Sequence, residues 1–185
     1  IIKPISAISS ETDDWDGREP FYTIDGSGFS VAEQTNLLTD AEIFEPWPDV
    51  DTSIGLNQRT WRGGYTDQTA TITLTLHGED KYRVSGIHLW NYLEPGATSR
   101  GTKTFNVEVS TNSIDWTAVN GGNYYSIKMW NEVGDAALEG ETFEFDKEYL
   151  NIQYVRINIT AVDGYPGFDE IRLIRKAPPA GMVFI

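Results

Sequence analysis

Hydrophobic and polar residues alternate with a period of two in six short stretches of this chain. The stretches are 72–76, 84–92, 105–109, 142–145, 154–160 and 170–174. Such alternation places one set of side chains in a core and the other in solvent, so each stretch predicts a half-buried β-strand. We expect the apolar members of two of these strands to lie in the core: Phe105, Val107, Val109, Val155, Ile157 and Ile159.

Turn-forming residues separate the predicted strands. Clusters of Gly, Pro, Asn and Asp occupy 94–96, 112–113, 120–123 and 163–167, and these residues favour the backbone angles at which strands end. The first sixty residues predict long aromatic loops with one short helix near 31–38. Many short strands without a long helical period predict an all-β fold, an antiparallel β-sandwich of the jelly-roll type.

The length of the chain is that of one sandwich domain. Its 185 residues, 39% of them hydrophobic, are enough to bury a single core. We expect residues 1–176 to form the domain and 177–185 to be a linker or tail to a larger parent protein, because this end is rich in Pro, Ala and Gly. No apolar run approaches the roughly 18 residues that would span a membrane.

The charge balance narrows the range of partners. The chain has 28 acidic and 14 basic residues, for a formal net charge of −14, so its average surface repels phosphate backbones and anionic lipids. We therefore expect neither a nucleic-acid nor a membrane partner. Clustered carboxylates suit a hard cation such as Ca²⁺. With no cysteine, disulfides and cysteine-based zinc or catalytic sites are excluded.

Three segments, taken in order, resemble a family of sugar-binding domains. The first is the Asp-Gly turn in 24–30, and the second is the block 87–116, which contains Trp90-Asn91-Tyr92, Arg100-Gly101 and Asp115-Trp116. The third is the closing pair 154–159 and 167–173. They are similar to family 32 carbohydrate-binding modules, in the discoidin-like, coagulation factor V/VIII type C group. The resemblance implies a galactose-binding-domain-like sandwich that binds sugars, has no catalytic residues and holds a structural Ca²⁺.

The resemblance also implies where that calcium would bind. Asp25 and Glu170 would supply carboxylates and Ser30 a hydroxyl, with main-chain oxygens near Tyr22, Ser27 and Asp169 completing the oxygen shell that Ca²⁺ prefers. The alternative is that Asp25 begins an ordinary turn and that Glu170 is a solvated strand residue. The acidic loop 13–17 could hold a cation as well, although such runs are more often simply solvated.

In the resembling modules, loops at one end of the sandwich bind the sugar. Here those loops would supply Tyr92, Glu94, Arg100 and Tyr165, with Trp15, Trp47 and Trp61 from the early loops closing over them. An aromatic ring stacks on a pyranose while charged and amide groups take its hydroxyls. Tyr92 could instead simply end a strand, and Arg100 could form a surface ion pair with Glu94. We expect four other conspicuous side chains to be structural, the first two in the core: Trp90, Trp116, His88 and Arg156.

The preferred function is a carbohydrate-binding module with an oligo- or polysaccharide partner. We expect a monomer, secreted or at the bacterial cell surface, covalently linked to a polysaccharide-degrading catalytic domain that it targets to glycans. One alternative is a polysaccharide lyase or glycoside hydrolase domain, although no acid/base pair or triad stands out among the many carboxylates. The other is a cell-surface adhesion module of the same fold.

Overall fold

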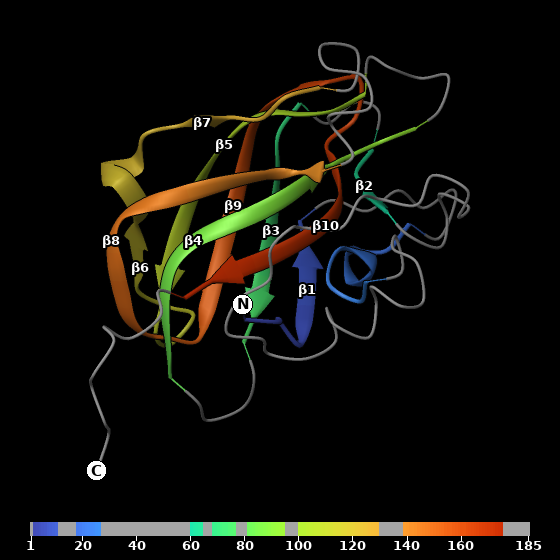
Figure 1. Cartoon of the computed structure of the whole chain (residues 1–185). Helices are drawn as coiled ribbons and strands as arrows, with labels where there is room; N and C mark the ends of the chain where they lie inside the picture. Colours follow the sequence, from blue (N-terminus) through green and yellow to red (C-terminus); the bar gives the residue numbers. More distant parts are fainter. Residues whose placement is uncertain are drawn as a thin grey trace.

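The computed structural model describes residues 2–10, 18–26, 60–64, 68–76, 81–94, 100–129 and 139–175. They form two antiparallel sheets that pack face to face as a β-sandwich (Figure 1). The predicted all-β sandwich is thereby confirmed. The predicted helix near 31–38 and the predicted tail 177–185 lie outside the described residues.

The larger sheet has the strand order β1, β3, β9, β5, β6, and β7 also pairs with β5. Its strands are β1 (Ser6–Ser9), β3 (Ala70–Thr75), β5 (Gly101–Ser110), β6 (Trp116–Ala118), β7 (Tyr125–Ser126) and β9 (Tyr154–Asp163). The smaller sheet has the order β2, β10, β4, β8. Its strands are β2 (Trp61–Arg62), β4 (Tyr82–Asn91), β8 (Glu141–Ile152) and β10 (Gly167–Ile174).

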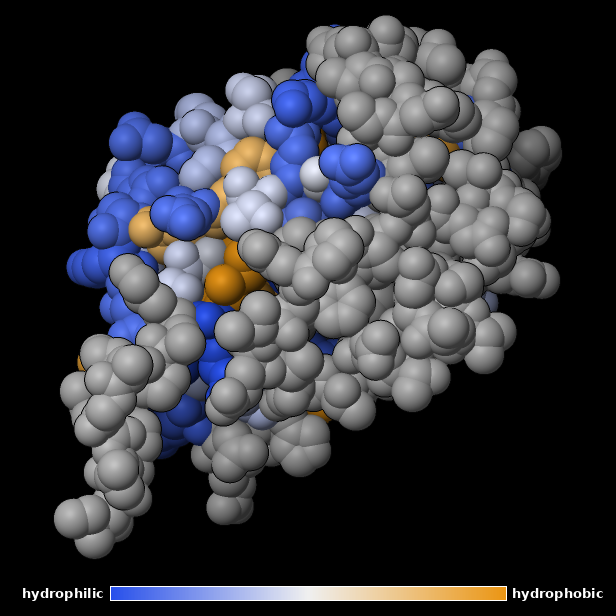
Figure 2. All heavy atoms as spheres, viewed as in Figure 1, coloured by the Kyte–Doolittle hydropathy of each residue, from blue (hydrophilic) through white to orange (hydrophobic). Residues whose placement is uncertain are grey.

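Short helical segments in the described ranges include a single-turn 3-10 helix, η1 (Pro20–Thr23), and η3 (Val119–Gly122), which is interrupted by left-handed backbone angles at Asn120 and Gly121. None of the helices there has the length and hydropathy of a membrane span. Figure 2 views the same face as Figure 1, and its described part is mostly hydrophilic, with apolar groups confined to a small area.

Alternation correctly located the six longer strands. All six predicted core residues of β5 and β9 are buried, as are Ile72 and Leu74 of β3. Phe105 lies at the centre of an aromatic group, with ring centroids 5.3 Å from Tyr125 and 5.1 Å from Phe143. Burial of each such side chain contributes on the order of 1.5–3 kcal/mol, so the interface between the two sheets is the main source of stability.

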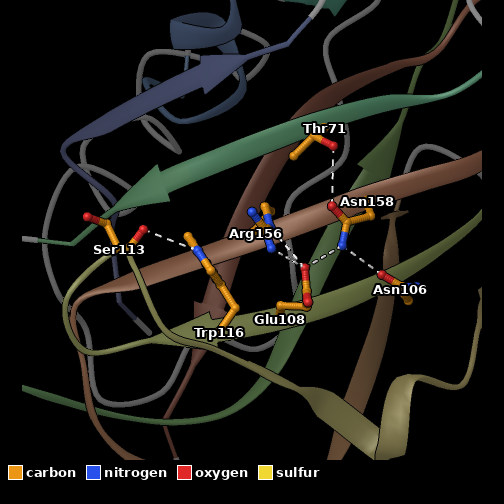
Figure 3. Close-up of polar contacts among 7 residues, drawn as sticks. All are labelled: Thr71, Asn106, Glu108, Ser113, Trp116, Arg156 and Asn158. Atoms are coloured by element: carbon orange, nitrogen blue, oxygen red, sulfur yellow. Dashed lines mark hydrogen bonds and ion pairs between the residues drawn. The ribbon is translucent and has the colours of Figure 1, made fainter.

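The prediction that Trp116 lies in the core is wrong. Trp116 is opposite Ser110 across β6 and β5 and lies half-buried on the outer face of the larger sheet. The Arg156 guanidinium lies over its ring, 4.1 Å from the centroid, and also bonds Glu108 at 2.7 Å (Figure 3). The cation–π contact with Arg156 stabilises the Trp116 ring at the surface. Arg156 is structural, as expected.

The outer face of the smaller sheet is also buried. Arg172 of β10 pairs with His88 of β4, and Glu170 pairs with Trp90; all four side chains have little or no exposed surface. This confirms that Trp90 is buried. His88 Nε2 lies 3.1 Å from the Glu139 carbonyl, and Nδ1 lies 2.7 Å from the Thr142 hydroxyl. A neutral imidazole matches these partners if Nε2 donates and Nδ1 accepts.

Burial lowers the pKa of His88 from 6.5 to about 4, despite the hydrogen bond to the Glu139 carbonyl, which opposes the shift. Because the folded pKa lies below the unfolded one, the contribution of His88 to stability is complete above pH 6.5 and is lost as the pH falls toward 4. We expect the free energy of unfolding of the wild type to drop over this window by up to about 3 kcal/mol more than that of His88→Gln. Urea denaturation at a series of pH values measures this difference, and parallel pH profiles would contradict it.

Candidate functional site

Four of the predicted sugar-binding residues lie together at one end of the sandwich. Tyr92 and Glu94 follow β4, Arg100 immediately precedes β5, and Tyr165 lies in the turn between β9 and β10. β4 pairs with β10, and β5 pairs with β9, so the loops that leave these strands meet at the same end. We call Tyr92, Glu94, Arg100 and Tyr165, together with Arg18 and Arg62, the tip cluster.

Asn91 links the two sheets beneath the tip cluster. Its Nδ2 donates to the Thr102 carbonyl at 2.8 Å, while its Oδ1 accepts from the backbone N–H groups of Thr102 at 3.0 Å and Tyr92 at 2.9 Å. The Thr102 hydroxyl donates to the Gly167 carbonyl at 3.1 Å. These bonds join the end of β4 to the starts of β5 and β10, so the tip residues stand on a fixed frame.

Gly167 allows the close approach of strands that this frame requires. A Cβ atom at this position would lie 2.7 Å from the Trp61 carbonyl oxygen and 2.9 Å from the Tyr92 ring. Both distances are shorter than van der Waals contact. Only glycine therefore lets β10 begin directly against β2 and Tyr92.

Glu94 is the centre of the polar contacts in the tip cluster. Its Oε2 accepts from the Tyr92 hydroxyl at 2.7 Å and from Arg100 Nη1 at 2.6 Å, and Arg18 Nη1 lies 4.0 Å away. Arg18 Nη1 in turn donates to the Tyr92 hydroxyl at 2.5 Å. Burial alone would raise the pKa of Glu94, but the hydrogen bonds from Tyr92 and Arg100, with the charges of Arg100 and Arg18, outweigh it and lower the pKa. Glu94 is therefore a carboxylate at neutral pH.

The exposed side of the Glu94–Arg100 pair has unused hydrogen-bonding groups. Within the described residues, all hydrogen bonds of Glu94 use Oε2, and the only one from the Arg100 side chain uses Nη1. Glu94 Oε1 is left as an acceptor, and Arg100 Nε and Nη2 are left as donors. The two side chains are 17% and 32% exposed, so a ligand at the tip can reach them.

Two guanidinium groups lie over the ring of Tyr165. Arg62 is 4.3 Å and Arg100 is 5.0 Å from the ring centroid, and the ring is half-buried. The sequence did not point to Arg18 or Arg62 as site residues. Arg18 lies outside any regular strand, and Arg62 is in a strand of two residues. The signal that could have found them is their charge, since basic residues are scarce in this chain.

The tryptophans predicted to close over the sugar are placed differently or lie outside the described residues. Trp61 is fully buried and stacks against Phe168 at 6.4 Å between ring centroids, so it presents no face to a ligand. Tyr92 is also buried; its hydroxyl bonds Glu94 and Arg18, and the Arg18 guanidinium lies over its ring, 6.0 Å from the centroid. Trp15 and Trp47 lie outside the described residues. Their predicted contacts with sugar stay predictions.

A cavity of about 110 Å³ lies on the β8 side of Asn91, lined by Ile127, Lys128 and Glu141 among others. Ligand pockets usually measure roughly 300–1,000 Å³. This cavity is too small to enclose a sugar ring, so it does not compete with the tip cluster as a binding site.

The predicted metal ligands meet at a second, buried place. Glu170 of β10 has no exposed surface, and its Oε2 accepts from the backbone N–H of Gly26 at 3.0 Å. Its other oxygen forms an ion pair with Arg172, which is equally buried and also donates to the Ile171 carbonyl at 2.8 Å. The expectation of a solvated Glu170 is excluded. The turn at Asp25 and Gly26 therefore lies directly against β10, as the resemblance implied.

Burial raises the pKa of Glu170 to about 8, although the charge of Arg172 opposes the shift; the nearby Asp25 carboxylate reinforces it. Within the described ranges, no three acidic or histidine side chains converge on one point, so a cation would also need main-chain oxygens. The ligands that the resemblance implies are oxygens, the type that Ca²⁺ takes, and Glu170 and the turn at Asp25 meet here, but the two Glu170 oxygens already contact the Gly26 N–H and the Arg172 guanidinium. Ser27 and Ser30 lie outside the described residues.

The fold is shared with solved carbohydrate-binding modules. CpGH89CBM32-5 from Clostridium perfringens, a family 32 module in complex with GalNAc-β-1,3-galactose, has a TM-score of 0.59 at 13% identity, covering 92% of this chain and 94% of its own. The family 32 module of AlyQ in complex with 4,5-unsaturated mannuronic acid has a TM-score of 0.57 at 17% identity, covering 95% and 98%. An F5/8 type C domain from Bacteroides fragilis has a TM-score of 0.54 at 15% identity, covering 93% and 95%.

These likenesses confirm the resemblance at the level of the fold. The chain has the architecture of family 32 carbohydrate-binding modules and F5/8 type C domains over nearly its whole length. No family model matches the sequence, and no curated protein matches it. The likeness is therefore one of structure at low identity, and the function must be argued from the side chains.

Tyr92→Phe tests the network that holds Glu94. The substitution keeps the buried ring and removes the hydroxyl that donates to Glu94 and accepts from Arg18. We expect a loss of about 1–3 kcal/mol in the free energy of unfolding, because charged partners in a partly buried site lose a hydrogen bond. Tyr124→Phe is the matched control: its ring is 65% exposed, and we expect a change within about 0.5 kcal/mol. Equal effects of the two substitutions in urea denaturation would refute the network's role.

Proposed function

We propose that this chain is a non-catalytic carbohydrate-binding module and that its tip cluster binds the sugar. The observation that carries the proposal is the Glu94–Arg100 pair. One bond of 2.6 Å joins the two side chains and orients them, while Glu94 Oε1 and Arg100 Nε and Nη2 make no hydrogen bond with any residue that the structure describes. An acceptor adjacent to a fork of donors matches the adjacent hydroxyls of a pyranose, each of which both donates and accepts.

The buried members of the tip cluster hold this pair in place. Tyr92 and Arg18 contact Glu94 Oε2, the oxygen that also accepts from Arg100, so the carboxylate is held in one orientation. Tyr165 supplies the aromatic surface at the rim, on a turn whose backbone is anchored by the bond from Gly101 N–H to the Tyr165 carbonyl at 3.1 Å. A ligand meets side chains that are already ordered, which lowers the entropic cost of binding.

The proteins of similar fold support this assignment. Their bound ligands are a galactose-containing disaccharide in one case and an unsaturated mannuronic acid in another. A small site of this kind binds weakly, and linkage to an enzyme that acts on the same polymer would raise its effective affinity. We therefore propose that the module directs a larger, secreted bacterial polysaccharide-degrading enzyme to its substrate. A domain of the same fold that adheres to a cell-surface glycan is the second candidate.

Arg100→Ala and Tyr165→Ala should each weaken retention on a polysaccharide gel that retains the wild type. Loss of a charged donor or of the rim aromatic should cost on the order of 1–3 kcal/mol of binding, roughly tenfold to a hundredfold in affinity. The control is Arg83→Ala, which removes an exposed arginine paired with Glu148 at 2.5 Å, at the opposite end of β4. Affinity gel electrophoresis across a panel of polysaccharides measures the effect. Unchanged retention of both tip variants would move the site elsewhere, and release of products from the gel would indicate an enzyme.

We also propose a structural Ca²⁺ bound by Asp25 and Glu170, with main-chain oxygens from the turn at 22–27 and from Asp169. Bound calcium would supply positive charge to the buried Glu170 carboxylate. The observation that supports the proposal is that this carboxylate lies within hydrogen-bond distance of the Gly26 turn while its burial is only partly compensated. The ion would then join the early turn to β10 and perform no chemistry.

Calcium should raise the melting temperature of the wild type relative to EDTA, because a ligand that binds only the folded state stabilises it by mass action. The rise should be abolished in Asp25→Ala and in Glu170→Ala. Glu148→Ala removes a partly exposed carboxylate, 22% exposed and paired with Arg83 at the other end of β4, and should keep the full rise. Differential scanning calorimetry at matched ionic strength measures these shifts. Superimposable wild-type curves in calcium and EDTA would exclude the metal.

A further inference from the structure

We propose that the tip cluster selects an acidic glycan, a polyuronate whose carboxylate binds Arg100, over a neutral one. The inference rests on the sugar site proposed above and names its substrate class. It is carried by the concentration of arginine at this end of an acidic chain, by the way two of these arginines share one aromatic ring, and by the donors that Arg100 has left over.

The charge of the tip cluster contrasts with that of the chain. The protein has twice as many acidic as basic residues and a net charge of −14, so most of its surface repels an anionic polymer. Within the described residues, the tip cluster holds three guanidinium groups, Arg18, Arg62 and Arg100, and one carboxylate, Glu94. The nearby Asp163 is paired with Lys103 at 3.3 Å. Among these described side chains the guanidinium groups outnumber the carboxylate, and Arg100, with 32% of its side chain exposed, is the one that an anion can contact.

Two arginines converge on Tyr165. Arg62 and Arg100 lie 4.3 Å and 5.0 Å from its ring centroid. Arg62 is buried at 6% exposure, whereas the Arg100 side chain is 32% exposed, so Arg100 is the one of the two that a ligand can contact and Arg62 helps to hold the Tyr165 ring. An aromatic ring that already holds two cations has less apolar face to offer a neutral pyranose. The same arrangement suits an anion, because the ring and the surrounding protein hold the guanidinium groups in orientation before the ligand arrives.

A uronic acid has two kinds of group that the tip cluster can bind, hydroxyls and a carboxylate. Its hydroxyls can donate to Glu94 Oε1, and its C6 carboxylate can accept two parallel bonds from a guanidinium fork. Arg100 Nε and Nη2 form such a fork, and neither donates a hydrogen bond within the described residues. The hexose with a CH₂OH group at C6 keeps the hydroxyl contacts but loses the charge-assisted pair.

The first experiment compares acidic polymers with their own esters. Polygalacturonate and alginate are tested against methyl-esterified pectin and propylene glycol alginate, which keep the polymer backbone but mask the carboxylates; neutral galactan completes the panel. We expect at least one acidic polymer to bind roughly tenfold or more tightly than its ester, as loss of a charge-assisted pair implies, and its binding to weaken as salt is raised. Affinity gels and isothermal titration calorimetry give these ratios.

The outcomes distinguish the preference for acidic glycans from the sugar site itself. Binding to galactan or to an ester as tight as to the acidic polymers overturns the acidic preference and leaves the sugar site standing. Failure to bind any member of the panel or of a wider glycan array overturns the sugar site, and the acidic preference with it. Binding of acidic polymers that is insensitive to every tip substitution assigns the effect to another surface and also overturns the inference.

Arginine variants test whether the tip cluster causes the preference for acidic glycans. Arg100→Gln should reduce the ratio of acid to ester affinity toward one, while Arg100→Lys, which keeps the charge but lacks the fork, should restore part of it. Arg62→Gln should act in the same direction, and its melting temperature shows whether the domain is still folded. The matched control is Arg83→Gln, which makes the same change in net charge on an exposed ion pair with Glu148. An unchanged ratio in Arg100→Gln refutes the assignment.

Discussion

The side chain of Asn91 joins the two sheets at the end where the loops of the tip cluster emerge. β4 belongs to the smaller sheet and β5 to the larger one, and Asn91 bonds both the N–H and the C=O of Thr102 across that boundary. A buried amide whose donors and acceptor are all used is a strong constraint, since any shift of either strand would leave polar groups unsatisfied. Tyr92, Glu94 and Arg100 are all within a few residues of this contact, and their positions follow from it.

The longer strands could be predicted because their cores are built from alternating residues. β5 and β9 have buried apolar residues at every second position, and that pattern is visible without a structure. β2 and β7 have two residues each, too few for a period to be seen. The burial of Arg172 and His88 on the outer face of the smaller sheet was less visible, because both occupy positions that alternation assigns to solvent, whereas the burial of Trp90 on the same face was expected from its large ring.

The candidate site was predictable in part for a similar reason. Tyr92, Glu94 and Arg100 are close in sequence and flank a strand end, and Tyr165 stands in a turn, so resemblance to known modules brings them together. Arg18 and Arg62 come from distant segments and reach the cluster only through the pairing of β2 with β10 and the course of the chain before η1. The position of Trp116 was predicted wrongly because a large ring is usually buried in the core. Here the Arg156 guanidinium covers the ring at the surface.

The direction of β10 determines where the last strand of the sandwich ends. The strand begins at Gly167, beside Tyr92 and the tip cluster, and runs to Ile174, which pairs with Gly86 in the first half of β4. At roughly 3.3 Å per residue, its seven steps carry the chain on the order of 20 Å away from the tip. The described chain therefore leaves β10 away from the tip cluster, so the last strand of the sandwich does not end beside the groups that a ligand would contact.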